Sequence, residues 1–215
     1  MALSDRQIER YSRQIIVPGI GGIGQERLLA AKVGLIGELV DVEAPLAYLV
    51  GAGIGTVFVM SGGGAIDSRV IDDLSGLNPD SRVITSAPPD PIDLLLAIIG
   101  SDASFETARR AIDSHAGRTA TIARLDLPPR IASLGASPCP LCADVELLGG
   151  FGQKAEQAEF VEMLATASAI AILAGNEPAA PRLIVFEGYD SRNLAIARRA
   201  GTDRCCCETP GRADG

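Results

Sequence analysis

The chain has 215 residues, enough for one large domain, and 47% of them are apolar, so it can bury a core built mainly from aliphatic side chains. Its net charge of −8 argues against nucleic acid or an anionic membrane as a partner, because both bind basic surfaces. Charged residues near the start argue against a signal peptide, and no apolar run reaches the ~20 residues of a membrane-spanning helix, so we expect a cytoplasmic protein.

Helical and strand-like segments alternate along the chain. The predicted helices span residues 6–14, 24–31, 43–51, 66–77, 105–115 and 155–173. The predicted strands span residues 33–36, 56–60, 82–85, 93–99, 119–124, 130–134 and, as the last one, 182–187. This alternation predicts an α/β fold with a doubly wound sheet.

Several motifs resemble the ThiF/MoeB/HesA family, the prokaryotic relatives of ubiquitin-activating enzymes. The first covers residues 3–37, LSDRQIERYSRQIIVPGIGGIGQERLLAA followed by KVGLIG. The others follow in family order and read VGAGIGTVFVM (50–60), LNPDSRV (77–83), DLLLAIIGSDASFETARRA (93–111), PCPLC (138–142) and the cysteine cluster at 205–207. The family adenylates the C-terminal glycine of a small ubiquitin-like sulfur carrier, so the resemblance implies a role in such a pathway.

The resemblance also implies how the chain is organised. We expect a Rossmann-like, mostly parallel sheet with added antiparallel strands in a single domain over residues 1–209. Within it, residues 1–31 would form a helical dimerisation arm and residues 32–135 a degenerate nucleotide-binding half. Residues 136–209 would carry a zinc knuckle and a carrier-binding surface, and residues 210–215 a disordered tail.

The segment after the first predicted strand departs from the family. The family continues there into a glycine-rich nucleotide loop, whereas Gly37 is followed by ELVDVEAP. Such loops need glycine because bare backbone approaches the phosphates at the positive end of a helix. The carboxylates of Glu38, Asp41 and Glu43 would instead repel a triphosphate. The chain therefore lacks the glycine-rich loop with which the family binds the phosphates of ATP.

Other parts of the adenylation apparatus are also missing. The second predicted strand ends at Met60 and runs into Ser61 and three glycines, where the family has an acidic residue for the ribose. The segment that carries the family's second arginine and its lysine is absent. No cysteine for thioester or persulfide chemistry lies between Cys142 and Cys205.

Two functional residues of the family survive by position. Arg13, in YSRQ, matches the arginine that reaches across the dimer to the other subunit's phosphates; as an alternative, it pairs with Glu9 on the helix surface. Asp102, in GSDAS, matches the acidic residue that positions magnesium and nucleotide; as an alternative, it is an ordinary helix-cap aspartate.

Glycines are the remaining candidates for contacts with a cofactor. The run Gly62, Gly63 and Gly64, together with Gly37, offers backbone amides to an anion such as the phosphates of ATP. The alternative is a tight turn without a ligand, which is the commoner use of such a run.

The cysteines predict a structural zinc site. Cys139 and Cys142 form a CxxC pair, and a tetrahedral site needs a second pair, for which Cys205 and Cys207 are preferred over Cys206. The resemblance implies a CxxC at this position, which the three consecutive cysteines replace. The alternative is two clusters of free or oxidisable thiols.

Three functions remain open on the sequence alone. The favoured one is a non-catalytic scaffold that pairs with itself, with an active homologue or with a ubiquitin-like carrier, and that donates Arg13 in trans. The second is an ATP-dependent adenylyltransferase with an altered site around Asp102. The third is a maturation factor that recognises the tail of a peptide or carrier without activating it.

Overall fold

The computed structural model describes residues 2–62, 67–88, 91–114, 119–134, 152–176, 181–188 and 190–196. Short apolar runs form its strands, as expected for a sheet that is covered on both faces. The strands are β1 (Lys32–Ile36), β2 (Thr56–Met60), β3 (Arg82–Ile84), β4 (Leu94–Ile99), β5 (Thr119–Arg124), β6 (Arg130–Leu134), β7 (Arg182–Glu187) and β8 (Asp190–Ala195).

One sheet contains all of these strands, in the order β3-β2-β1-β4-β5-β6-β7-β8. The first five lie parallel to one another. Strands β6, β7 and β8 continue the sheet with antiparallel pairing. The α/β fold with a mostly parallel sheet and added antiparallel strands is therefore confirmed.

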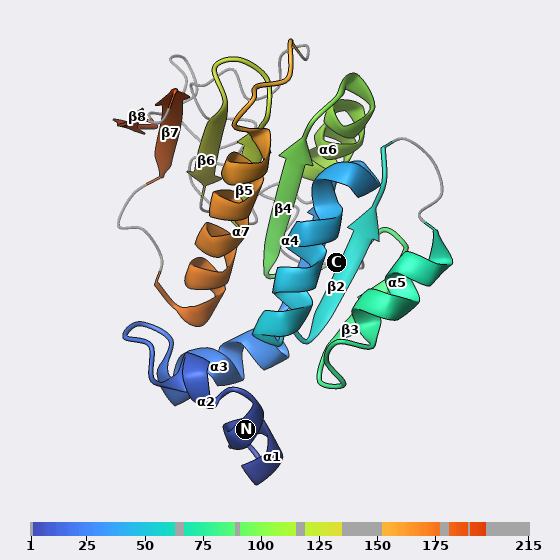
Figure 1. Cartoon of the computed structure of the whole chain (residues 1–215), viewed down its shortest axis with the longest axis vertical. Coiled ribbons are helices and arrows are strands. Elements are labelled where there is room, and N and C mark those ends of the chain that lie inside the picture. Colours follow the sequence, from blue (N-terminus) through green and yellow to red (C-terminus); the bar gives the residue numbers. More distant parts are fainter. Residues whose placement is uncertain are drawn as a thin grey trace, which may run out of the picture.

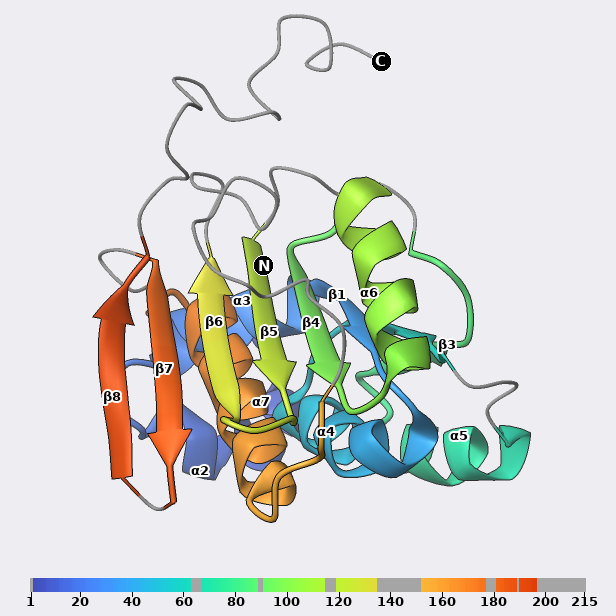
Figure 2. The same ribbon diagram turned by 90° about the horizontal axis from the view of Figure 1, so that it is seen from above.

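Helices cover both faces of the sheet (Figures 1 and 2). The helices are α1 (Asp5–Arg10), α2 (Ser12–Ile15), α3 (Gly21–Ala30), α4 (Leu39–Ala52), α5 (Ser68–Ser75), α6 (Asp102–Ser114) and α7 (Ala158–Ala174). One core lies beneath α4, α5 and α7, and a second core lies beneath α6 on the opposite face. The helices therefore wind on both sides, as the alternation of elements predicts.

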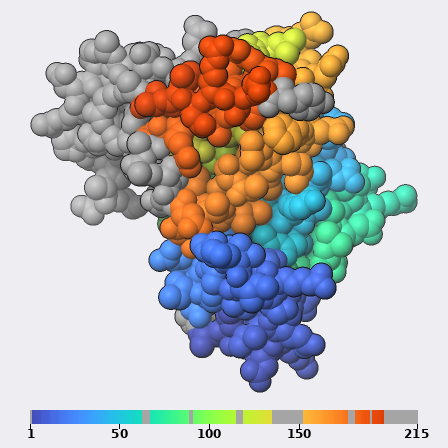
Figure 3. All heavy atoms as spheres, turned by 60° about the vertical axis from the view of Figure 1, so that its left-hand side comes forward, coloured from blue at the N-terminus to red at the C-terminus, as the bar shows by residue number. Residues whose placement is uncertain are grey.

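The first three helices lie together at the amino ends of the parallel strands (Figures 1 and 3). A single helix is predicted over residues 6–14, but the structure interrupts it at Tyr11, which separates α1 from α2. The Tyr11 side chain is only 1% exposed. The break between α1 and α2 therefore falls at a residue whose ring is buried and whose hydroxyl bonds to Asn78.

The start of α4 and the end of the sheet differ most from the prediction, while α3, α6 and α7 begin three residues away from their predicted starts. Helix α4 begins at Leu39, four residues before its predicted start, and Pro45 lies in its interior rather than in its first turn. The buried side chains of Val42, Leu46 and Leu49 recur at helical spacing and outweigh the backbone hydrogen bond that a proline removes. Strand β8 also follows the strand that we predicted to be the last, because its exposed, polar sequence DSRNLA carries no apolar signal.

In the part of the chain that the structure describes, no helix combines the length and the apolar character needed to span a bilayer.

Candidate functional site

The sheet topology places the candidate site at the carboxyl ends of β1 and β4. Chain connections run outward in opposite directions from these two neighbouring strands, first to β2 and β3, then to β5. In open parallel sheets, ligands bind outside the carboxyl ends of the strands at such a switch point. The turns that follow β1, β2 and β4 are therefore the segments to inspect.

Gly37 leads from β1 to α4 and is tightly enclosed. A Cβ on this residue would lie 2.5 Å from Val42 Cγ1 and 2.9 Å from the carbonyl oxygen of Ile98. Close packing between β1, β4 and α4 thus accounts for the glycine. Its surroundings leave no room for a ligand against its α-carbon.

Glu38 occupies the N-cap position of α4 in an extended conformation. Its carboxylate accepts a very short hydrogen bond from the Ser101 hydroxyl, which belongs to the turn after β4. A negative charge at a helix N-terminus is favourable because the free N–H groups there carry positive potential. The side chain of Glu38 makes no capping hydrogen bond to these N–H groups, so its carboxylate adds a negative charge beside the turn at which a nucleotide-binding protein receives phosphate.

Asp41, in the first turn of α4, is only 2% exposed and pairs with Lys154 at 2.5 Å between Oδ1 and Nζ. Gly100 makes room for this carboxylate, since a Cβ there would lie 2.0 Å from Asp41 Oδ2. Of the three carboxylates that the sequence places near this turn, Asp41 is paired with Lys154, whereas Glu43 is exposed on α4.

The turns after β2 and β4 meet at the same edge. Gly62 lies so close to the start of α6 that a Cβ would come within 2.5 Å of the Ala103 carbonyl. Asp102 is the exposed first residue of α6. The structure therefore brings Gly37, Gly62 and Asp102 to one edge, and packing against α6 explains Gly62 without a ligand. Gly63 and Gly64 lie outside the described residues.

A buried ion pair follows β5. Arg124, 1% exposed, donates two hydrogen bonds to Asp126, of 2.9 Å from Nε and 2.7 Å from Nη2. Burial alone would raise the pKa of Asp126, but the hydrogen bonds and charge of Arg124 outweigh it and lower that pKa. Gly152 N–H also donates to Asp126, which ties the segment before α7 to the sheet.

Glu162, on α7, is a second buried carboxyl group, and its pKa is shifted in the opposite direction to that of Asp126. It is 5% exposed, and no hydrogen bond or ion pair reaches its carboxyl group from any residue that the structure describes. Burial raises the pKa of Glu162 to about 7; the charge of Asp41 adds to this shift and that of Lys154 opposes it. We refer to Glu38, Asp41, Ser101, Lys154 and Glu162 as the carboxyl-end cluster.

Arg13 lies far from this cluster within its own chain. Its neighbour Gln14 donates a hydrogen bond to the carbonyl of Gly51, near the C-terminal end of α4, whereas Glu38 caps the N-terminal end. Helix α4 has 14 residues and is therefore about 21 Å long. Arg13 is exposed and makes no ion pair with Glu9 or with any other described residue. Arg13 therefore makes no contact with the turn after β1 of its own chain, and its predicted role in trans stays a prediction.

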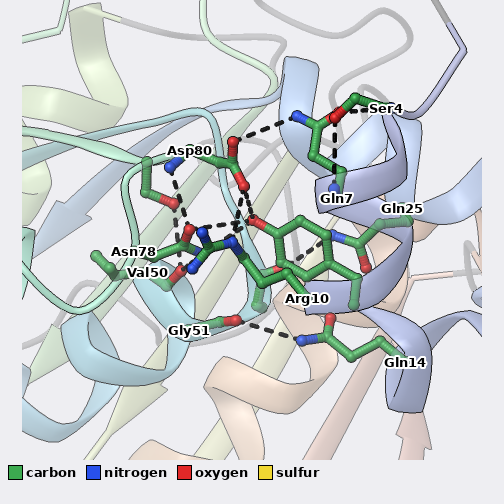
Figure 4. Close-up of polar contacts among 12 residues, drawn as sticks. Ser4, Gln7, Arg10, Gln14, Gln25, Val50, Gly51, Asn78 and Asp80 are labelled. Carbon is green, nitrogen blue, oxygen red and sulfur yellow. Dashed lines mark hydrogen bonds and ion pairs between the residues drawn. The ribbon is translucent and has the colours of Figure 1, made fainter.

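A hydrogen-bond network that the sequence does not predict lies at the amino ends of the strands (Figure 4). The buried Tyr11 hydroxyl contacts Asn78 Nδ2 at 2.9 Å and Asp80 Oδ2 at 3.1 Å. Asn78 also donates to the Val50 carbonyl at 2.8 Å, and Arg10 pairs with Asp80 at 3.2 Å. We refer to Arg10, Tyr11, Asn78 and Asp80 as the amino-end clamp. The motifs YSRQ and LNPDSRV both contribute side chains to the clamp. Their joint presence in the sequence is the feature from which a contact between the two segments could be predicted.

The predicted zinc ligands Cys139, Cys142, Cys205 and Cys207, and the neighbouring Cys206, lie outside the described residues. Among the residues that are described, no three His, Cys, Asp or Glu side chains form a group that could hold a metal ion.

Relatives in curated sequences are adenylyltransferases with a sulfurtransferase function. The chain is 44% identical over 71 residues to adenylyltransferase and sulfurtransferase UBA4 of Candida glabrata, a match that covers 33% of this chain and 15% of the relative. It is 40% identical over 72 residues to the probable adenylyltransferase/sulfurtransferase MoeZ of Mycobacterium tuberculosis, covering 34% and 17%. The matches thus span less than a fifth of the length of these relatives. No family model matches the chain.

Solved structures share the fold over nearly the whole chain. Escherichia coli MccB with ATP superposes with a TM-score of 0.66 at 14% identity, covering 91% of this chain and 73% of MccB. PaaA gives a TM-score of 0.60 at 16% identity, covering 90% of this chain and 84% of PaaA. The chain is therefore similar in sequence, over about a third of its length, to adenylyltransferase/sulfurtransferases of the ThiF/MoeB type, and it shares its fold with MccB and PaaA.

Proposed function

We propose that this chain is a non-catalytic ThiF/MoeB-like subunit that takes part in the activation of a ubiquitin-like sulfur carrier or a peptide. The observation that carries the proposal is the negative charge at the N-terminus of α4. There the backbone of Glu38 occupies the N-cap position, and its carboxylate, which accepts a hydrogen bond from Ser101, stands beside the turn at which a nucleotide-binding protein receives phosphate.

Charge and shape at this turn both disfavour ATP. A triphosphate brought to the α4 N-terminus would face the Glu38 carboxylate in a partly buried, low-dielectric position. The side chains of Leu39 and Val40 also stand in the first turn of α4, where close backbone approach needs glycine. The residues present do not fit the phosphates of ATP as a nucleotide-binding turn would.

A second molecule supplies the catalytic site in this proposal. The partner is another copy of the chain or an active homologue, and the arm formed by α1, α2 and α3 makes the contact. Arg13 supports this arrangement, because it is exposed at the end of the molecule opposite the chain's own α4 turn. The surface that binds the carrier or peptide belongs to the second half of the chain.

Zinc completes the proposal as a structural ion. Cys139 and Cys142 would bind it with two thiolates from residues 205–207, which ties the end of the chain to its middle. Mass spectrometry of the native protein before and after chelation tests this site. We expect one zinc ion per chain and a loss of thermal stability on its removal; a metal-free protein that unfolds at the same temperature would contradict it.

A second candidate function is ATP-dependent adenylation with an altered site. The comparisons favour it, since the curated relatives described above are named adenylyltransferases and one MccB structure was determined with ATP. Asp102 at the start of α6 would then contact the nucleotide, and the phosphates would lie elsewhere than against Glu38.

Exchange of labelled pyrophosphate into ATP separates the two candidates. The chain is assayed alone, with each ubiquitin-like carrier or peptide of its source organism, and with a catalytically competent homologue. The non-catalytic subunit predicts no exchange by the chain alone or with carrier, and a rate in the mixed complex that falls with Arg13→Ala. Exchange that requires only this chain and its carrier, and that Asp102→Ala abolishes, would establish the second candidate instead.

A further inference from the structure

Helices α4 and α7 pack together, and each carries a buried carboxyl group, Asp41 on α4 and Glu162 on α7. Asp41 is 2% exposed and Glu162 is 5% exposed. Among the described residues, Lys154 is the basic group whose charge acts on both: its ammonium, on a side chain that is 43% exposed, pairs with Asp41, and its charge lowers the pKa of Glu162. If both carboxyl groups are ionised, the two buried carboxylates share one partly exposed ammonium and leave one negative charge uncompensated, which is costly for buried groups.

Lys154 belongs to a short segment, residues 152–157, that leads into α7. Two backbone hydrogen bonds hold this segment to the end of β5: Ala155 N–H to the Leu125 carbonyl at 2.7 Å, and Leu127 N–H to the Gln153 carbonyl at 2.9 Å. The Lys154–Asp41 ion pair attaches this segment to α4 through a side chain. Any change in the charge balance around Asp41 therefore acts on the attachment of this segment.

We propose that Asp41, Lys154 and Glu162 form a proton-operated joint between α4 and α7. When Glu162 is protonated, Lys154 neutralises Asp41 and the segment 152–157 stays packed against α4. When Glu162 is ionised, two buried carboxylates compete for one ammonium, and the segment with the first turn of α7 opens toward solvent.

The other charges near Glu162 do not remove this imbalance. On α7, Glu159 is exposed and adds a further negative charge that also raises the pKa of Glu162. On α4, Glu38 bonds to Ser101 rather than to Glu162. The nearby Asp126 is neutralised by Arg124, which shows how a buried carboxylate is stabilised when it has a dedicated partner. Glu162 has no such partner among the described residues.

The direction of the pH effect follows from the folded-state pKa of about 7, above the ordinary value of 4.5 for a glutamate. Folded protein holds the Glu162 proton where unfolded or opened protein has released it. Stability contributed by the protonated joint is therefore full below about pH 4.5 and is lost as the pH rises through 7. Opening of the segment should increase over the same interval.

Hydrogen exchange measured by NMR at pH 6 and pH 8 tests the joint in the full chain. After correction for intrinsic exchange rates, the protection of the Ala155 amide should fall about tenfold or more at pH 8 in the wild type, since one pKa unit corresponds to a tenfold change. Glu162→Gln should show nearly equal protection at both pH values. Glu159→Gln, a matched exposed change on the same helix, should retain the wild-type fall.

Titration of the Glu162 side-chain carboxyl carbon by NMR provides a second, independent measurement. We expect a midpoint near 7 that moves down in Asp41→Asn and up in Lys154→Met, because these variants remove a negative and a positive neighbour. A midpoint near 4.5, or wild-type Ala155 protection that is independent of pH, would overturn the proposal. The proposal would also be overturned if the protection of the Ala155 amide fell between pH 6 and pH 8 in Glu162→Gln as much as in the wild type.

Discussion

The two ends of helix α4 are stabilised in different ways. At its C-terminal end, the amino-end clamp joins α1 and the residues after α5 through a buried tyrosine hydroxyl and an asparagine side chain. At its N-terminal end, the carboxyl-end cluster holds three carboxyl groups against one lysine. The clamp comes from motifs that resemble the ThiF/MoeB family. In the cluster, Glu38 and Asp41 belong to the segment that departs from the family, whereas Ser101 belongs to a motif that resembles it.

The two sets of contacts have different consequences. The clamp fixes how the N-terminal arm packs on the sheet. The cluster lies at the switch point, where the side chains decide which ligand is accepted. Substitutions in the clamp should therefore act on stability, and substitutions in the cluster should act on what the proposed site accepts.

The clamp and the cluster should also respond differently to pH. Burial raises the pKa of Tyr11 to about 12, so its hydroxyl keeps its proton throughout the physiological range. Glu162 in the cluster titrates near neutrality. Changes of pH between 6 and 8 should therefore act on one end of α4 and leave the other unchanged.

The largest expected effect comes from removing the centre of the clamp. Tyr11→Ala should lower the free energy of unfolding by about 3–5 kcal/mol, because it deletes a buried ring and leaves Asn78 without its partner. Urea unfolding measures this change. Tyr48→Ala, at a 61% exposed position on α4, is the control and should change stability by less than about 0.5 kcal/mol. Equal effects of the two variants would refute the structural role of the clamp.

Two glycines on α4 and at its start should give effects of opposite sign. Gly37→Ala forces a Cβ against Val42 and the Ile98 backbone and should cost about 1–3 kcal/mol. Gly51→Ala, inside α4 with open space around its α-carbon, should stabilise the protein by about 0.5–1 kcal/mol, because alanine is the better helix former. Thermal unfolding of both variants tests the prediction, and a stabilising Gly37→Ala would contradict the tight enclosure of this turn.

Arg13→Ala should produce the smallest effect on the isolated chain. The side chain is exposed and contacts no described residue through a hydrogen bond or an ion pair, so stability should change by less than about 0.5 kcal/mol. Its effect should appear only in a complex with another subunit. A large loss of stability in the isolated chain would instead reveal an intramolecular role and count against an action in trans.

The sequence predicts most of the fold because buried parallel strands are short continuous apolar runs. Strands β1, β2 and β4 have this pattern and were located to within one residue. The last strand, β8, was missed because its exposed side chains give neither an apolar run nor an alternation. The start of α4 was misplaced because Pro45 suggested a first turn, while the apolar face that begins at Val42 decided the structure.

The candidate site was predicted only in part, since ion pairs between distant residues leave no local pattern. Glu38 and Asp41 were identified as carboxylates at the nucleotide turn, but not the partner that neutralises Asp41, Lys154, which lies 113 residues further along the chain. Nothing in the sequence pattern distinguishes Glu162 from an ordinary exposed polar residue of an alanine-rich helix. Its burial and raised pKa follow from the packing of α7 against α4, which only the folded structure defines.

The binding of magnesium–ATP, measured by isothermal titration calorimetry on the zinc-loaded chain up to millimolar nucleotide, tests the central claim most directly. Escherichia coli MccB, which has been crystallised with ATP, serves as the positive control. Because Glu38 places a carboxylate beside the N-terminus of α4 and the turn lacks the glycines that a phosphate needs, we predict no saturable heat for this chain. Saturable binding that disappears in Asp102→Ala would contradict this account and establish a nucleotide site built in a different way.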